Sequence, residues 1–133
     1  MASQVWLKTY RESGIPAEID PNAHRSVVAM LEAAMKTYAG RPAFHSFGQT
    51  PTYADVDRQS RHFAAYLQKK LGVKKGDRIA VMMPNLLAFP VAFLGIVRAG
   101  AAQVNVNPLY TPRELEHQLK DAGVRIMVVF AGS

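Results

Sequence analysis

Residues 77–130 read DRIAVMMPNLLAFPVAFLGIVRAGAAQVNVNPLYTPRELEHQLKDAGVRIMVVF, and this stretch alternates short apolar runs with helical patterns. The runs DRIAVMM, AQVNVN and VRIMVVF are rich in isoleucine and valine, which favour strands. A helical pattern separates each run from the next. The order strand, helix, strand, helix, strand predicts a parallel α/β layer with right-handed connections.

The first of these helical patterns covers residues 86–99 and is apolar nearly all round, as in a helix buried in a core. Together with the preceding strand it forms an uncharged run, residues 79–97, that has the length of a membrane span. Pro84 and Asn85 interrupt this run as a strand-to-helix turn would. We therefore expect a buried strand followed by a buried helix, and no transmembrane span.

The second helical pattern, TPRELEHQLKDAG, carries signals at both of its ends. Thr111 is a good N-cap, Pro112 suits the first position, and Glu114 completes a capping box. Gly123 ends the helix. The residues expected to form its buried face are Leu115, Leu119 and Ala122.

Upstream of this layer we predict one segment in two parts. Residues 1–22 look irregular because Gly14, Pro16 and Pro21 punctuate them, and residues 23–76 should hold two helices and a short hairpin. The first helix has its apolar face from Val27 to Tyr38. The hairpin is PAFHSFGQTPTY, and the second helix begins after Thr52 with Asp55 in a weaker capping box. With residues 77–133 as the βαβαβ unit, the whole chain is expected to form a single N-terminal segment.

Composition excludes several kinds of chemistry. Cysteine is absent, so disulfides, cysteine-ligated zinc and a cysteine nucleophile cannot occur. The formal charge is +6, and much of it comes from the segment KKLGVKKGDR, residues 69–78. No aromatic residues interleave with these cations and no nucleic-acid-binding motif is present, so we expect no nucleic-acid partner. The segment instead fits a helix end followed by a solvated turn.

The motifs of common active sites are missing as well. Gly95 and Gly100 have the glycine spacing of a triphosphate-binding loop, but they lie in an apolar helix and at its end. The histidines lack metal-ligand spacing and no serine sits in G-x-S-x-G. The close carboxylate pairs, Asp55 with Asp57 and Glu114 with Glu116, fit capping and dipole roles. We assign no catalytic, cofactor-binding or metal-ligating residue.

Three asparagines stand near predicted strand ends, where α/β folds place their ligand crevices. They are Asn85, Asn105 and Asn107. Turn chemistry is the role we expect for all three.

Several segments together resemble one family. These are RPAF with TYADVDRQSRHFAAYL, then GVKKGDRIAVMMPNLLAFPVAFLGIVRAGAAQVNVNPLYTPRELEHQLKDAG, and the strand VRIMVV; GIPAEIDP near the start also fits. In order and length they resemble the N-terminal portion of AMP-forming long-chain fatty-acyl-CoA ligases of the adenylate-forming superfamily. The resemblance covers nearly the whole chain.

The resemblance implies a two-step ligase for a complete protein. A fatty carboxylate attacks the α-phosphate of Mg-ATP to give an acyl-adenylate, and the thiol of coenzyme A then displaces AMP. The family's phosphate loop, its ribose-binding aspartate and its catalytic lysine lie downstream of the region represented here. We therefore expect this segment to be the first part of the large N-terminal domain, to hold no cofactor and to be inactive alone.

The resemblance also suggests partners and a location. It implies a cytoplasmic protein with peripheral contact at the inner membrane face, to which residues 69–78 would contribute. It further suggests a homodimer, with Val5, Trp6, Leu7 and Tyr10 as candidate contacts. Two alternatives stay open: a free-standing α/β binding or interaction module without catalysis, and a basic nucleic-acid binder.

Overall fold

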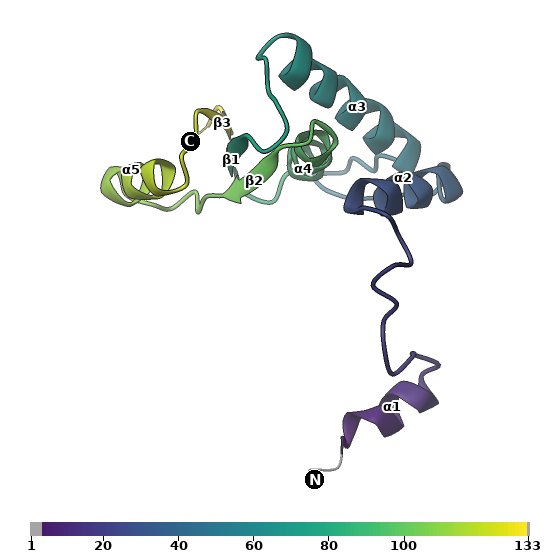
Figure 1. Cartoon of the computed structure of the whole chain (residues 1–133). Helices are drawn as coiled ribbons and strands as arrows, with labels where there is room; N and C mark the ends of the chain where they lie inside the picture. The colour runs from purple at the N-terminus through teal and green to yellow at the C-terminus, as the bar shows by residue number, and fades with distance from the viewer. Residues whose placement is uncertain (1–3, 133) are drawn as a thin grey trace.

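The computed structural model describes residues 4–132 (Figure 1). The elements follow in the order α1 (Trp6–Glu12), α2 (Val27–Thr37), α3 (Tyr53–Lys69), β1 (Arg78–Met82), α4 (Ala88–Arg98), β2 (Ala102–Asn105), α5 (Pro112–Asp121) and β3 (Ile126–Val129). Strands and helices alternate after residue 77 as the sequence predicts. The α/β fold class is therefore confirmed.

The three strands form a parallel sheet in the order β2-β1-β3. In its centre Ala80 of β1 is in register with Val104 of β2 on one side and Met127 of β3 on the other. Figure 1 shows α3 and α4 on one side of the sheet and α5 on the other. The chain is thus layered as helix, sheet and helix, with β1 between its two later neighbours.

The core lies between β1 and the pair α3 and α4. Ile79 of β1, Leu67 of α3 and Ile96 of α4 are all fully buried and belong to one apolar cluster. Residues of β3 pack against this cluster but are only half-buried, because β3 has a strand neighbour on one side alone within the described residues. A smaller cluster around Met35, Val56 and Leu94 joins α2 to the same helices.

Close packing of α3 against α4 depends on one glycine. A Cβ atom on Gly95 would lie 2.6 Å from Cδ1 of Phe63, far inside van der Waals contact. Gly95 therefore lets the Phe63 ring sit directly on the backbone of α4. This contact fixes how near the two helices approach.

Both predicted capping boxes are present. The hydroxyl of Thr52 accepts from the Asp55 amide at 3.2 Å, and Thr111 accepts from the Glu114 amide at 3.4 Å, with each carboxylate bonded back to the cap residue. The expected buried face of α5 is less covered than predicted. Leu115, Leu119 and Ala122 are only half-buried, because little of the described chain packs on that side.

Residues 4–22, expected to be irregular, contain α1. This helix has no buried residue and no side-chain cap, and in Figure 1 it lies apart from the other elements. Its local support is an exposed i,i+4 ion pair of 3.9 Å between Lys8 and Glu12. Our prediction missed it because the chain offers no capping signal there.

The expected hairpin is reduced to two isolated antiparallel bridges, Pro42 with Thr52 and Ser46 with Gln49. Phe47 and Gly48 connect the inner pair, both with positive φ as a type I′ turn requires. Within residues 4–132 no helix has the length and apolarity needed to cross a bilayer.

Candidate functional site

The strand order places a crevice at the carboxyl end of β1. The chain leaves β1 for β2 on one side and later returns to β3 on the other, with the connecting helices on opposite faces. Such a reversal opens a crevice at the strand ends, where α/β folds bind their ligands. A cavity of about 710 Å³ lies there, and we call it the switch-point crevice.

Apolar and polar residues occupy different parts of the switch-point crevice. The apolar wall comes from α3, from α4 and the residue before it, from β3, from the residue that follows β1, and from the turn before α3. It comprises Pro51, Phe63, Met83, Leu87, Ala88, Val91, Ala92 and Val128. The polar residues come from the start of α3 and the turn before it, and they are Gln49, Thr50, Asp55 and Gln59. The cavity volume falls within the range of small-molecule sites.

Asp55 is the carboxylate of this crevice, and its oxygens already have partners. The amide and the hydroxyl of Thr52 donate to Oδ2 at 3.0 and 2.8 Å, and Arg58 donates to Oδ1 at 2.8 Å. These hydrogen bonds, led by that of the Thr52 amide, lower the pKa of Asp55 to about 2. Asp55 is therefore a permanent anion that stabilises a helix terminus rather than a proton carrier.

A second of the four polar side chains on this rim is paired as well. The hydroxyl of Thr50 lies 2.7 Å from Nδ1 of His45. No group of three or more potential metal ligands occurs within residues 4–132. The crevice thus offers apolar surface rather than free acids, bases or metal ligands.

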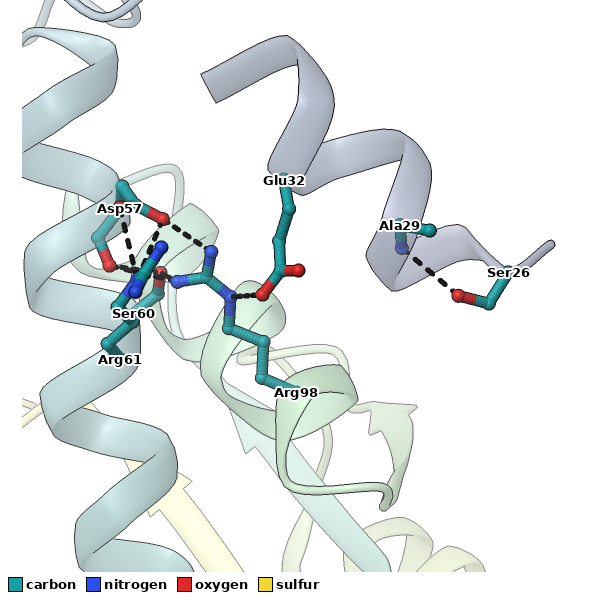
Figure 2. Close-up of polar contacts among 7 residues, drawn as sticks. All are labelled: Ser26, Ala29, Glu32, Asp57, Ser60, Arg61 and Arg98. Carbon is teal, nitrogen blue, oxygen red and sulfur yellow. Dashed lines mark hydrogen bonds and ion pairs between the residues drawn. The ribbon is translucent and has the colours of Figure 1, made fainter. Parts of the chain in front are cut away.

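A second polar cluster lies where α2, α3 and α4 meet, and Figure 2 shows Arg98 at its centre. Nη1 of Arg98 donates to the backbone oxygen of Asp57 at 2.9 Å and to the hydroxyl of Ser60 at 2.8 Å, while Nη2 donates to the Asp57 carboxylate. The Arg98 side chain is only 6% exposed. We call these three residues the arginine clamp.

The arginine clamp is electrostatically compensated. Burial raises the pKa of Asp57, but hydrogen bonds from Arg98 and Arg61 outweigh it and leave the pKa below its ordinary value. Glu32 of α2 contributes a longer ion pair, 3.5 Å from Nε of Arg98. Since every contact joins helices of this chain, the clamp stabilises the helix layer that forms one wall of the crevice.

The three asparagines end up in different surroundings. Asn107 accepts from the Leu109 amide at 3.0 Å, which confirms the turn role expected for it. Asn105 instead lies in β2 and accepts from the Gln103 side chain at 2.7 Å. Asn85 follows β1 and lines a separate cavity of about 220 Å³ beside His45. None of the three lines the switch-point crevice.

The basic segment, residues 69–78, lies away from the crevice. Its Arg78 lines a cavity of about 390 Å³ at the opposite, amino end of β1 and β3, together with Arg125. Arg78 also donates to the backbone oxygen of Ala122 at 3.1 Å, just after α5. Arg78, the first residue of β1, therefore joins the end of α5 to the sheet.

Our sequence predictions missed the arginine clamp. We expected Asp57 to have a capping or dipole role near the start of a helix and gave Arg98 no role. The available signal was Ser60, a hydroxyl four residues after Val56 and four before Ala64 on the buried face of α3. A buried hydroxyl needs a hydrogen-bond partner, and Arg98 provides it.

A comparison with known protein families matches the part of the chain that holds the crevice and the arginine clamp. A family model described as AMP-binding enzyme matches residues 31–132, which include both the crevice and the clamp. The chain belongs to the AMP-binding enzyme family. It is 54% identical over 126 residues to the long-chain-fatty-acid–CoA ligase of Yersinia pestis, covering 95% of this chain and 22% of that protein.

Solved structures of AMP-binding enzymes share this fold. A benzoate CoA ligase from Burkholderia xenovorans LB400 superposes with a TM-score of 0.73 at 32% identity, over 79% of this chain and 21% of that one. The anthranilate CoA ligase AuaEII in complex with anthranoyl-AMP gives a TM-score of 0.76 at 26% identity, over 90% and 22% of the two chains. The chain thus spans about a fifth of the length of the relatives it matches.

Proposed function

We propose that these 133 residues are the N-terminal part of a long-chain fatty acid–CoA ligase. As a whole, that protein would activate a fatty acid with ATP to an acyl-adenylate and then form acyl-CoA. The observation that carries this proposal is the 54% identity over 126 residues to a ligase of the same name. The role proposed for residues 1–133 is that of a scaffold, one N-terminal segment on which the sites are completed.

The residues of the switch-point crevice do not fit Mg-ATP. The carboxylate of Asp55 is already held by Thr52 and Arg58, and no cation among the described residues lines the cavity to receive phosphate oxygens. Charge on a transferring phosphoryl group needs metal ions or cationic side chains close by. We therefore place no step of the reaction on these residues and propose that the segment alone is inactive.

The decisive experiment compares the 133-residue chain with the full-length parent. Pyrophosphate release from ATP is measured with and without a long-chain fatty acid, and acyl-CoA formation is measured after addition of coenzyme A. We expect both activities in the parent and neither in the shorter chain. A reading frame that stops after residue 133, with no ligase activity, would instead favour a free-standing binding or interaction module.

We also propose a cytoplasmic location with peripheral membrane contact through the basic segment, and a homodimer formed through α1. In support, Lys69, Lys70, Lys74 and Lys75 are exposed, and Trp6 of α1 is 52% exposed. Co-sedimentation of the parent with anionic and neutral vesicles tests the membrane contact, because charge-driven binding requires anionic lipid and weakens with salt. The homodimer is tested by comparing the sedimentation of the parent with that of its Trp6→Ser variant.

A further inference from the structure

We propose that the cavity of about 390 Å³ at the amino ends of β1 and β3 binds a phosphate group through the guanidiniums of Arg78 and Arg125. We call this cavity the amino-end pocket. The phosphate belongs either to a lipid headgroup or to a soluble phosphate ester. The inference goes beyond the proposed ligase reaction and does not depend on it, and it gives the proposed membrane contact one defined site.

The register of the sheet brings the two arginines together. Ile79 of β1 is in register with Ile126 of β3. The residues immediately before them, Arg78 and Arg125, therefore lie side by side at the strand ends and line the same pocket. Because side chains alternate along a strand and Ile79 is buried, both arginines point away from the core. Two neighbouring cations repel each other, and an anion bound between them relieves that repulsion.

The described chain neutralises neither guanidinium. Nη1 of Arg78 donates to the backbone oxygen of Ala122, which fixes this group in place and leaves it further N–H donors. Asp77 is the carboxylate among the lining residues, but it accepts from the Lys74 amide at 2.8 Å. Within residues 4–132 neither arginine takes part in an ion pair. Guanidinium groups offer paired N–H donors that match the geometry of phosphate oxygens.

Two internal loops, residues 71–77 and 123–125, form most of the pocket wall. They contribute Gly72, Gly76 and Gly123, which have no side chains to cover the guanidiniums. A Cβ atom on Gly123 would lie 3.4 Å from Nη1 of Arg78, so a larger residue there would crowd that group. The volume of the pocket falls within the range of small-molecule sites, so a phosphate can enter with the group that it esterifies.

The charge around the pocket also favours an anion. Exposed lysines occupy the end of α3 and the turn after it, namely Lys69, Lys70, Lys74 and Lys75. The carboxyl ends of α3 and α5 lie close to the pocket, but a helix end carries only about half a unit of negative charge. The lysines and the two arginines outweigh it. Such a surface attracts anions from a distance, and the paired arginines supply the specific contact.

Protection from phenylglyoxal, a reagent that modifies guanidinium groups, tests the pocket in the full-length parent. The modification rate of Arg125 is divided by that of Arg113, which is exposed on α5 but lies outside the pocket. Both rates are obtained by mass spectrometry of the modified peptides. The soluble probe is inorganic phosphate, compared with sodium chloride at equal ionic strength. The lipid probe is vesicles of phosphatidic acid in phosphatidylcholine, compared with phosphatidylcholine alone.

We expect at least one of the two phosphate probes to lower the ratio about fivefold or more, because a guanidinium that holds an anion is withheld from the reagent. A fall with inorganic phosphate identifies a soluble ester as a ligand, and a fall with phosphatidic acid vesicles alone identifies a lipid headgroup. A ratio unchanged by both probes, including equal protection of both arginines, would overturn the inference.

Two variants of the parent separate the pocket from general attraction to an anionic surface, because each removes one positive charge. If a headgroup fills the pocket, Arg125→Gln should weaken co-sedimentation with phosphatidic acid vesicles about fivefold more than Arg113→Gln does. Equal losses, without protection by inorganic phosphate, would overturn the inference. Fatty-acid-dependent pyrophosphate release is measured on the same preparations of unsubstituted parent. An active parent without protection rejects the pocket alone, and an inactive parent with protection rejects the ligase function alone.

Discussion

Arg98, at the end of α4, and Asp57, in α3, form an ion pair in the interior of the helix layer (Figure 2). The guanidinium contacts both the carboxylate and the backbone oxygen of Asp57, and Ser60 accepts a third hydrogen bond. Residues far apart in sequence are thereby locked at one relative position of the two helices. The pair is a determinant of helix register within the wall of the switch-point crevice.

Loss of Arg98 is expected to destabilise the folded chain. Arg98→Met leaves Asp57 and Ser60 without their main partner in a largely buried place, which should lower the free energy of unfolding by about 2–3 kcal/mol. Arg61→Met is the control, because Arg61 contacts the same carboxylate at 3.1 Å from a side chain that is 64% exposed. Its effect should stay below about 1 kcal/mol. Urea unfolding of both variants checks this, and equal effects would contradict the role of the clamp.

Filling the contact between α3 and α4 should also destabilise the chain. In Gly95→Ala the new methyl group meets the ring of Phe63, and overpacking of this kind costs about 1–3 kcal/mol. Gly40→Ala adds the same methyl group where no atom lies within 4 Å and φ is not positive. That variant should be neutral or slightly more stable. Thermal unfolding distinguishes the two, and a neutral Gly95→Ala would mean that the helices separate easily.

Acid should destabilise the fold through lowered carboxylate pKa values. Asp55 has a folded-state pKa of about 2 against an ordinary value of 3.8, so the unfolded chain takes up its proton first as the pH falls. The stability from this group is complete above about pH 5 and is lost as the pH falls towards about 2. Asp57 acts in the same direction, since its pKa is also lowered.

NMR titration of the carboxyl carbons checks the Asp55 midpoint directly. Stability against pH should be flatter below about pH 5 in Asp55→Asn than in the unsubstituted chain. An ordinary midpoint for Asp55 would show that the capping box opens in solution.

The cap of α5 is expected to be important for local order. Thr111→Ala removes both hydrogen bonds between the threonine hydroxyl and Glu114, with a loss of about 1 kcal/mol. Since α5 has no buried residue, the loss should appear as faster amide exchange in α5 rather than as global unfolding. Thr111→Ser keeps the hydroxyl and should exchange like the original chain. Faster exchange in both variants would locate the effect in the lost methyl group.

The sequence predicted what local chemistry determines. Thr52 and Thr111 predict where two helices begin, because a capping box depends only on residues next to it in the sequence. The strand at Ile79 and the helix around Ile96 follow from an apolar pattern that only a core accommodates. Asn107 likewise forms its turn through a hydrogen bond two residues away.

What the sequence did not predict depends on contacts between distant residues. The partners Arg98 and Asp57 lie on different helices. The hydroxyl of Ser60 on the buried face of α3 signals that a partner is needed, but nothing in the sequence identifies that partner as Arg98. The switch-point crevice needs the strand order and the placement of two helices against it, neither of which has a local pattern. Helix α1 was missed for a different reason. It has neither a side-chain cap nor a buried residue, so the sequence carries no pattern that would predict it.

The placement of β1 between its two later neighbours also sets an order of assembly. During synthesis β1 and α4 follow the N-terminal helices, and β2 completes a compact βαβ unit with them before β3 is made. β3 must then travel back across β1 to the vacant side, closing the longest loop of the sheet. Folding should therefore proceed from a nucleus in residues 53–105, with the last strand arriving late on a template that is already formed.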